Sequence, residues 1–219
     1  MRPRRASQAT RLTTAPDPSS FPLKRTFDVC ISSLSLLLLS PVLLAIAIAV
    51  KLDSAGPVFF RQERVGRGFR PFRIFKFRTM VVDAPLRGGQ ITSGHDDPRI
   101  TRVGRFLRRW KLDELPQLLN VVAGEMSLVG PRPEVPRYVE MFRSDYADIL
   151  RVRPGITDLA SIKFRDEASL LSGKSNPEDT YVREILPAKV SLAHEYIAQA
   201  SFGLDLRILF RTAWQMACG

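Results

Sequence analysis

The chain has 219 residues, of which 45% are hydrophobic and 25% are charged, and its formal net charge is +11 with an isoelectric point near 10.3. The two cysteines, Cys30 and Cys218, exclude a disulfide framework and fit a reducing, cytoplasmic setting. The positive charge indicates an anionic partner, which is nucleic acid, acidic lipid head groups or a phosphorylated substrate.

Residues 1–20 are rich in Pro, Ser, Thr and Arg and contain almost nothing to bury, so they are predicted to form a disordered basic tail. Such a tail is attracted to anionic membrane lipid. Residues 21–52 contain one apolar segment, and the remaining residues, 53–219, are enough for one globular domain of about 170 residues with a real core.

The apolar run at residues 27–50 is interrupted near its middle by Ser40 and Pro41. About 20 apolar residues can cross a bilayer, but proline kinks or breaks a helix, and the serine hydroxyl can satisfy a freed carbonyl. Basic residues flank both ends, and positive charge favours the cytoplasmic side. We therefore predict a re-entrant helix-break-helix over residues 21–52, with a kinked single-pass anchor as the alternative.

A cleaved signal peptide is excluded, because the apolar run is too long and no small-residue cleavage site follows it.

Beyond this run, residues 57–60 and 72–78 are predicted to be short strands, and the second strand alternates apolar and basic residues. The Gly66-Arg67-Gly68 turn between them favours a hairpin.

A helix is predicted over residues 98–110, with Asp97 as N-cap and Pro98 as its first residue. Its apolar residues recur at helical spacing: Ile100, Val103, Phe106, Leu107 and Trp110. The other positions hold Arg99, Arg102, Arg105, Arg108 and Arg109. Such arginines often form only a solvated face, but so many without an acid favour a surface that faces phosphates or lipid.

The segment from Lys111 to Val122 contains the strongest candidate chemistry. Pro116 is tolerated only in a first turn, so the helix is predicted to begin near Asp113 and to end at Gly124. The predicted buried stripe is Leu115, Leu118, Leu119 and Val122. Asp113 and Glu114 then lie at a helix N-terminus, where a carboxylate can act as a nucleophile, hold a divalent cation or simply cap the helix.

Two proline-rich loops follow, at residues 127–134 and 151–157. The first presents Arg132 between two prolines and suits bidentate phosphate recognition, although it is also an ordinary turn. A helix is predicted over residues 178–200, with His194 on its surface or in its packing. A second helix, over residues 204–216, is basic and amphipathic, which fits a membrane interface and a core-facing helix equally.

Several motifs, in this order, resemble those of the bacterial sugar transferases, also called monotopic phosphoglycosyl transferases. They are Lys24-Arg25, Phe27-Asp28, Ser40-Pro41, residues 56–60 (GPVFF), Gln62, Arg64, Gly66, residues 76–80 (KFRTM), residues 112–117 (LDELPQ), Asn120-Val121, residues 124–133 (GEMSLVGPRP) and residues 152–157 (VRPGIT). The likeness runs from about Leu23 to the C-terminus. Because the multi-span N-terminal region of larger members is not seen, the chain resembles the minimal catalytic unit of the family.

This resemblance implies an α+β fold that is mainly helical, with a compact catalytic domain of short strands and interfacial amphipathic helices on the cytoplasmic face of the bacterial inner membrane. The implied reaction is Mg²⁺-dependent transfer of a sugar phosphate from a UDP-sugar to polyprenyl (undecaprenyl) phosphate with release of UMP. It would be the first membrane step in the assembly of an exopolysaccharide, capsule, O-antigen or glycoprotein glycan.

Carried over by position, Asp113 is the expected nucleophile, which forms an aspartyl phospho-sugar, and Glu114 supports the metal or the acceptor. Four basic residues are expected to bind substrate phosphates: Lys76, Arg78, Arg132 and Arg165. Asp158-Leu159 departs from the Gly-Trp of many members, which puts sugar recognition inferred from those members in doubt.

Two other classes of protein fit parts of the sequence. A membrane-anchored nucleic-acid-binding protein explains the charge, but no recognisable reader motif is present, so no nucleic-acid partner is expected. A charge-anchored scaffold explains the tail and the membrane segment but leaves Asp113 and Glu114 without a role. The expected partners are a UDP-sugar, polyprenyl phosphate and anionic membrane lipid, and a homo-oligomer is compatible with the sequence.

Overall fold

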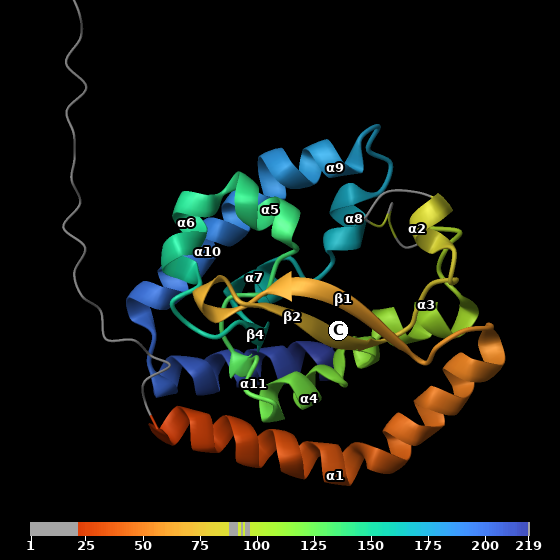
Figure 1. Ribbon diagram of the computed structural model, residues 1–219, viewed down its shortest axis with the longest axis horizontal. Coiled ribbons are helices and arrows are strands. Elements are labelled where there is room, and N and C mark those ends of the chain that lie inside the picture. Colours follow the sequence, from red (N-terminus) through yellow and green to blue (C-terminus); the bar gives the residue numbers. More distant parts are fainter. Residues whose placement is uncertain (1–21, 88–91, 93, 95–96, 219) are drawn as a thin grey trace, which may run out of the picture.

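The computed structural model describes residues 22–87, 92, 94 and 97–218, so the predicted tail at residues 1–20 lies outside the described part. The helices are α1 (Pro22–Asp53), α2 (Ala84–Arg87), α3 (Arg102–Arg109), α4 (Gln117–Val122), α5 (Pro136–Met141), α6 (Arg143–Ile149), α7 (Leu159–Lys163), α8 (Glu167–Leu171), α9 (Pro177–Thr180), α10 (Leu186–Gln199) and α11 (Phe202–Cys218). The strands are β1 (Phe59–Val65), β2 (Pro71–Phe77), β3 (Ser127–Val129) and β4 (Gly155–Thr157). The predicted α+β class, mainly helical with short strands, is confirmed (Figure 1).

Two small sheets organise the domain. Strands β1 and β2 form the predicted antiparallel hairpin, in a register that pairs Phe59 with Phe77 and Val65 with Pro71. The first strand was predicted over residues 57–60 and is longer, because pairing with β2 continues to Val65. Strands β3 and β4 pair in parallel, Ser127 with Gly155 and Val129 with Thr157, so the two proline-rich loops lie side by side.

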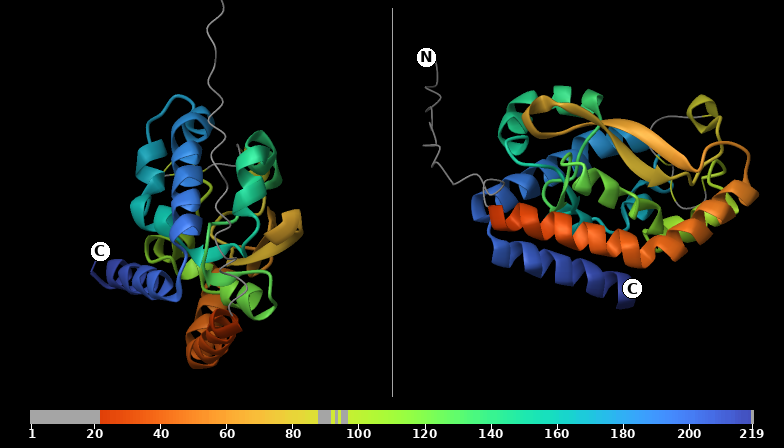
Figure 2. Two further views of the ribbon diagram at one scale, coloured as in Figure 1. Left: turned by 90° about the vertical axis from the view of Figure 1, so that its left-hand side faces the viewer. Right: turned by 60° about the horizontal axis from the view of Figure 1, so that its bottom comes forward.

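Helix α1 runs along the base of the molecule and bends in its middle (Figures 1 and 2). It stays helical through Ser40 and Pro41, and the Ser40 hydroxyl donates to the carbonyl of Leu37 at 2.7 Å. The missing proline N–H accounts for a bend at this place. The two arms do not fold back against each other, so the predicted break takes the form of a bend in one continuous helix.

The helix predicted over residues 98–110 begins later than expected, at Arg102. Its N-cap is Thr101, whose side chain accepts from the Gly104 N–H at 3.0 Å. Asp97 is occupied instead by the Arg99 guanidinium, with donor distances of 2.9 Å and 2.6 Å. Asp97 therefore holds a turn at residues 97–100 and does not cap α3.

The helix predicted to begin near Asp113 starts as a 3₁₀ turn, Leu112–Glu114, and becomes α-helical at Gln117. Its predicted stripe is wrong for Leu119 and Val122, which are exposed. The side facing β2 is buried instead, because Asn120 accepts from the Phe75 N–H at 2.9 Å and donates to the Arg73 carbonyl at 3.0 Å.

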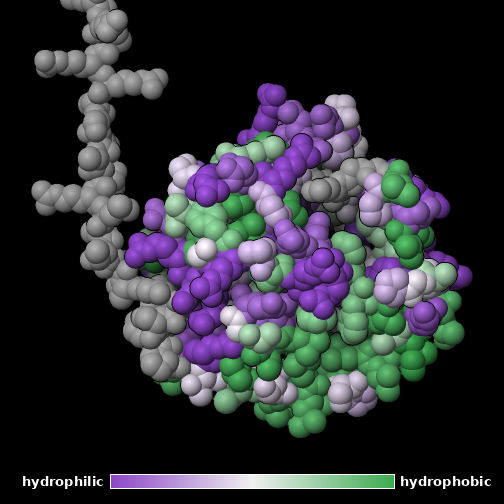
Figure 3. Space-filling model, viewed as in Figure 1, coloured by the Kyte–Doolittle hydropathy of each residue, from purple (hydrophilic) through white to green (hydrophobic). Residues whose placement is uncertain are grey.

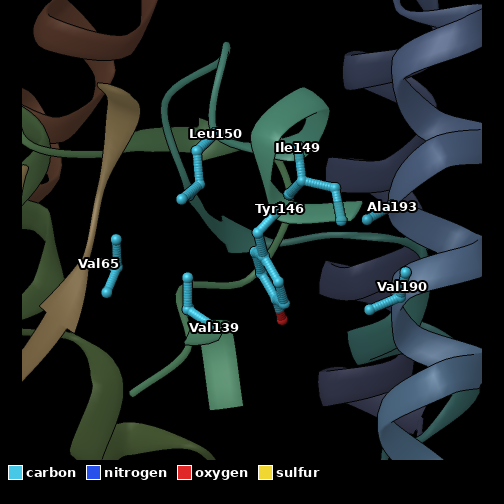
Figure 4. Packing of buried hydrophobic residues seen from close by; sticks show 7 residues of the cluster. All are labelled: Val65, Val139, Tyr146, Ile149, Leu150, Val190 and Ala193. Atoms are coloured by element: carbon cyan, nitrogen blue, oxygen red, sulfur yellow. The ribbon is translucent and has the colours of Figure 1, made fainter. Parts of the chain in front are cut away.

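The C-terminal helices lie close to their predicted positions. Helices α9 and α10, joined by a π-helical turn at Tyr181–Ile185, cover the predicted 178–200, and α11 covers 204–216. His194 is partly exposed, with Nε2 3.8 Å from an Asp145 oxygen. One core cluster joins β1, α5, α6 and α10 (Figure 4). Its members are Val65, Val139, Tyr146, Ile149, Leu150, Val190 and Ala193.

The base of the molecule is apolar. Hydrophobic residues gather along α1 in the space-filling view (Figure 3), and α1 is long and apolar enough to cross a membrane. Exposed apolar side chains of α1 include Leu34, Leu37, Leu38, Val42, Leu44 and Ile48. Phe210 and Trp214 of α11 are also exposed, as are Phe106 and Trp110 of the α3 segment, which had been expected on an apolar helix face.

Candidate active site

The candidate site is built on the 3₁₀ turn Leu112–Glu114, which connects α3 to α4 and contacts β2. Lys111 has a left-handed backbone (φ 55°), which reverses the chain after α3. Asp113 is buried, with 8% of its surface exposed, and Glu114 is partly buried. We call Lys76, Arg108, Asp113, Glu114 and Arg132 the reaction cluster.

Glu114 is held by two cations. Lys76, from β2, donates to Oε1 at 2.8 Å, and Arg132 donates to Oε1 and, at 3.1 Å, to Oε2. Burial alone would raise the pKa of Glu114, but Arg132 and Lys76 outweigh it and hold this pKa well below its usual range. Burial lowers the pKa of Lys76, although Glu114 opposes that shift. Glu114 is therefore ionised and fixed in position.

Asp113 differs from its neighbour. Within the described part of the chain, no hydrogen bond or ion pair of its carboxylate is found. Burial raises its pKa and the adjacent Glu114 charge adds to this, against the attraction of Lys76 and Arg108. The site thus contains a buried, unpaired carboxylate in a basic environment.

Arg132 is positioned by its own loop. Its backbone N–H donates to Asp158 Oδ2 at 3.0 Å, and its guanidinium also donates to the Ile156 carbonyl at 3.3 Å. Asp158 in turn caps α7 through the Ser161 N–H at 2.6 Å. The residue that departs from the pattern of many family members therefore supports the backbone of the Arg132 loop.

Arg108 belongs to the site, although the sequence distinguished it from the other arginines of α3 in no way. Its guanidinium donates to the Thr79 hydroxyl at 2.9 Å and to the Thr92 hydroxyl at 3.1 Å. Burial lowers the pKa of Arg108, while Asp113 raises it, so the two side chains are close enough to interact. The available signal was its position five residues before Asp113, one residue before the end of α3.

The other two predicted phosphate ligands, Arg78 and Arg165, are not bonded to Asp113 or Glu114 in the described structure, and their contact with phosphate stays a prediction. Arg78 is buried at the C-terminal end of α1, where it donates to the carbonyls of Val50 at 3.3 Å and Ser54 at 2.7 Å. Gly56, with φ 118°, has a backbone conformation that other residues rarely adopt, and a Cβ there would lie 2.2 Å from Arg78 Nη1. Arg165 follows α7, is partly buried, and makes no hydrogen bond or ion pair with another described residue.

The opposite end of α1 is held by a second polar cluster, which we call the clasp: Lys24, Asp28, Ser127, Tyr196 and Asp205. Lys24 donates to Asp205 and, at 3.0 Å, to the Val129 carbonyl. Tyr196 donates to the other Asp205 oxygen at 2.8 Å, and Ser127 donates to Asp28 at 2.7 Å. Both ends of α1 are therefore bonded to the same domain.

An apolar cavity of about 210 Å³ lies between the middle of α1, the β1–β2 hairpin and α4. Its lining residues are Leu36, Leu43, Leu44, Ala47, Phe59, Phe77, Pro116 and Leu119. Pro116 lies three residues after Asp113, and Phe77 follows Lys76 directly. The cavity thus lies at the apolar base of the molecule, and its lining includes sequence neighbours of the reaction cluster but none of the cluster's own residues.

Residues 22–87, 92, 94 and 97–218 contain no group of three or more His, Cys, Asp or Glu side chains that could hold a metal ion. The free carboxylate of Asp113 is the type of oxygen ligand that Mg²⁺ prefers. Glu114 accepts three hydrogen bonds, two on Oε1 and one on Oε2, so Oε2 keeps a lone pair that could bind the same ion. Mg²⁺ fits this donor set if substrate phosphate and water complete its coordination, as is common where the ion serves phosphoryl transfer.

The sequence was compared with known proteins. The profile of the bacterial sugar transferase family matches residues 19–219. The chain is 41% identical to the UDP-glucose:undecaprenyl-phosphate glucose-1-phosphate transferase of Escherichia coli (strain K12) over 198 residues. These residues are 88% of this chain and 40% of the relative. It is 42% identical over 195 residues to the undecaprenyl-phosphate glucose phosphotransferase of Komagataeibacter xylinus, covering 86% and 35%.

A shorter relative is covered almost completely. The exopolysaccharide production protein PSS of Rhizobium leguminosarum bv. phaseoli is 38% identical over 196 residues, which are 87% of this chain and 92% of that protein. By contrast, the chain spans well under half the length of the Escherichia coli and Komagataeibacter relatives.

Proposed function

The chain belongs to the bacterial sugar transferase family, and from this membership we propose that it transfers a sugar phosphate from a UDP-sugar to polyprenyl phosphate, with release of UMP. The observation that carries the proposal is the unpaired Asp113 carboxylate, which is buried beside Glu114 and is attracted by Lys76, Arg108 and Lys111. A carboxylate without a donor is available to attack, and the surrounding cations can receive phosphoryl oxygens.

The proposed reaction has two displacements at phosphorus. An Asp113 oxygen attacks the β-phosphorus of the UDP-sugar and forms an O–P bond. The bond from that phosphorus to the bridging oxygen breaks, and UMP leaves with this oxygen and the electron pair. A polyprenyl phosphate oxygen then attacks the aspartyl phospho-sugar, which releases the Asp113 carboxylate and gives a polyprenyl diphosphate sugar. Since the second pKa of a phosphate monoester is about 6, the acceptor needs no strong base.

Lys76, Arg108 and Arg132 would neutralise the charge that spreads over the phosphoryl oxygens in both steps. Arg132 can offer two parallel N–H donors, which suits a phosphate. A bound Mg²⁺, with Asp113 and Glu114 as its protein ligands, would supply further charge neutralisation at the phosphates. Chelation is therefore expected to abolish turnover and added Mg²⁺ to restore it, whereas full activity in excess chelator would assign charge neutralisation to the basic residues alone.

The apolar cavity supports the acceptor part of the proposal. A polyprenyl phosphate joins a charged head to a long apolar chain, and the cavity lies between the apolar middle of α1 and Pro116, three residues after Asp113. The first isoprene units can occupy it while the phosphate contacts the basic residues.

The anchoring of α1 supports a re-entrant placement at the cytoplasmic face of the bacterial inner membrane. Lys24 and Arg78 bond the two ends of α1 to one domain, while the exposed apolar residues lie between these ends. Cysteine labelling near residues 20 and 55 in intact cells is expected to fail from the periplasmic side. Periplasmic labelling of either end would favour the single-pass anchor.

The direct test of the function is a screen of UDP-sugars for UMP release by purified protein with polyprenyl phosphate and Mg²⁺. We expect release with at least one donor, and a lipid product that contains its sugar phosphate. Binding of nucleic acid without UMP release would favour the nucleic-acid alternative, and neither activity would favour a scaffold. We propose that the product enters the assembly of a surface polysaccharide, such as the exopolysaccharide in the name of the Rhizobium relative. The donor sugar found in the screen would narrow which glycan this is.

A further inference from the structure

Gln117, on the first turn of α4, has a buried side chain that the proposed mechanism does not use. Its exposed fraction is 0%, and neither its amide nitrogen nor its amide oxygen has a hydrogen-bond partner in the described structure. A buried amide without partners costs free energy, so such groups are rare and call for an explanation.

Asn120, one turn later on the same helix, shows what a structural amide does here. It is equally buried, but its side chain accepts from the Phe75 N–H at 2.9 Å and donates to the Arg73 carbonyl at 3.0 Å. It also donates to Glu125 at 2.6 Å. Asn120 therefore joins α4 to β2, whereas Gln117 makes no such connection.

The position of Gln117 follows from its helical neighbours. Leu115 and Pro116 have right-handed helical backbones, so the chain is helical from the 3₁₀ turn into α4. Residues three or four apart then share a face, which places Gln117 beside Glu114 on one side and Val121 on the other. Val121 packs against Ile74 of β2, and Glu114 accepts from Lys76 of the same strand. Gln117 therefore shares a helix face with Glu114, which accepts from Lys76.

Glu114 needs a further donor during the proposed reaction. Its oxygens are shared by Lys76 and Arg132, the same cations that a substrate phosphate would attract. A buried carboxylate that loses a cation is strongly disfavoured unless another donor replaces it. An uncharged amide can do so without competing for the phosphate.

We propose that Gln117 is a positioning residue: when a substrate phosphate draws Lys76 or Arg132 away from Glu114, the Gln117 amide donates a hydrogen bond to the Glu114 carboxylate. The inference rests on the proposed function and adds to it how the site keeps Glu114 in place while its partners turn to the substrate.

The test compares Gln117→Met, which keeps length and removes the amide, with Asn120→Leu as the matched control. Thermal midpoints are measured with and without inorganic phosphate, and kcat/KM is measured by UMP release from a UDP-sugar that the wild type uses. Gln117→Met should have an unchanged or higher midpoint without phosphate and a smaller rise with it. Its kcat/KM should fall about 10- to 100-fold, the value of one hydrogen bond to a charged group. Asn120→Leu should lose midpoint and activity together.

A Gln117→Met variant that loses stability as Asn120→Leu does would make Gln117 a structural residue and overturn the inference. Unchanged kcat/KM and an unchanged phosphate effect would also overturn it and leave the proposed function intact. If the wild type releases no UMP from any UDP-sugar, the proposed function itself fails, and this inference fails with it.

Discussion

The reaction cluster and the clasp are both buried polar groups that contain two carboxylates, yet they differ in how completely those carboxylates are bonded. In the clasp, each oxygen of Asp28 and Asp205 accepts a hydrogen bond. In the reaction cluster, both Glu114 oxygens accept bonds, but Asp113 has none within the described part of the chain. The clasp thus satisfies both of its carboxylates, whereas the reaction cluster leaves one carboxylate available to a substrate.

The sharpest way to break this comparison is Asp113→Asn. Asparagine keeps the shape but cannot act as an anionic nucleophile, so UMP release should fall by about three orders of magnitude or more. Because burial of the Asp113 charge is unfavourable, removing that charge should leave the thermal midpoint equal to or above the wild-type value. Near-normal turnover of the variant would instead favour a one-step displacement.

Glu114→Gln should reduce both activity and stability. It leaves Lys76 and Arg132 without their shared carboxylate, which for a buried pair costs about 3 kcal/mol. We expect UMP release to fall about 100-fold, with a lower midpoint in denaturation experiments. A stability equal to that of the wild type would contradict the strong pairing seen at Glu114.

Lys24→Met tests the clasp in the same way. Asp205 would lose its cation in a buried setting, at a cost of about 3 kcal/mol in unfolding free energy. Because Lys24 is outside the reaction cluster, kcat per folded molecule should change less than about threefold. A loss of kcat as large as that of Glu114→Gln would mean that the clasp positions the reaction cluster.

The pH dependence should separate the two adjacent carboxylates. The pKa of Asp113 is raised, so its charge costs stability at neutral pH, and this cost disappears as the pH falls through the folded-state pKa. The pKa of Glu114 is lowered, so its contribution to stability is present above the unfolded-state pKa and is lost as the pH falls through the folded-state value. On acidification, kcat/KM should therefore fall before the midpoint does. If kcat/KM and the midpoint fell over the same pH range, the pKa values of Asp113 and Glu114 would be similar, which would contradict this expectation.

Much of this site could be predicted from the sequence. Asp113, Glu114 and Arg132 lie in local motifs with proline-restricted backbones, and the structure brings them together with Lys76. The hydrogen bonds of Arg78 to the end of α1 could not be predicted in the same way, because they depend on where α1 ends. The prediction of which side of α4 is buried was wrong, because hydrogen bonds between Asn120 and β2 override the apolar spacing. Asp97 was misjudged as a cap because an arginine two residues later occupies it.

The central claim is that Asp113 is left unpaired because it becomes covalently bonded to the substrate. The intact mass of the protein, measured after incubation with UDP-sugar and Mg²⁺ but no acceptor, tests this most directly. We expect the wild type to gain the mass of one phospho-sugar, which disappears when polyprenyl phosphate is added, and Asp113→Asn to gain none. UMP release by the wild type without such an adduct, or the same adduct on Asp113→Asn, would contradict the claim.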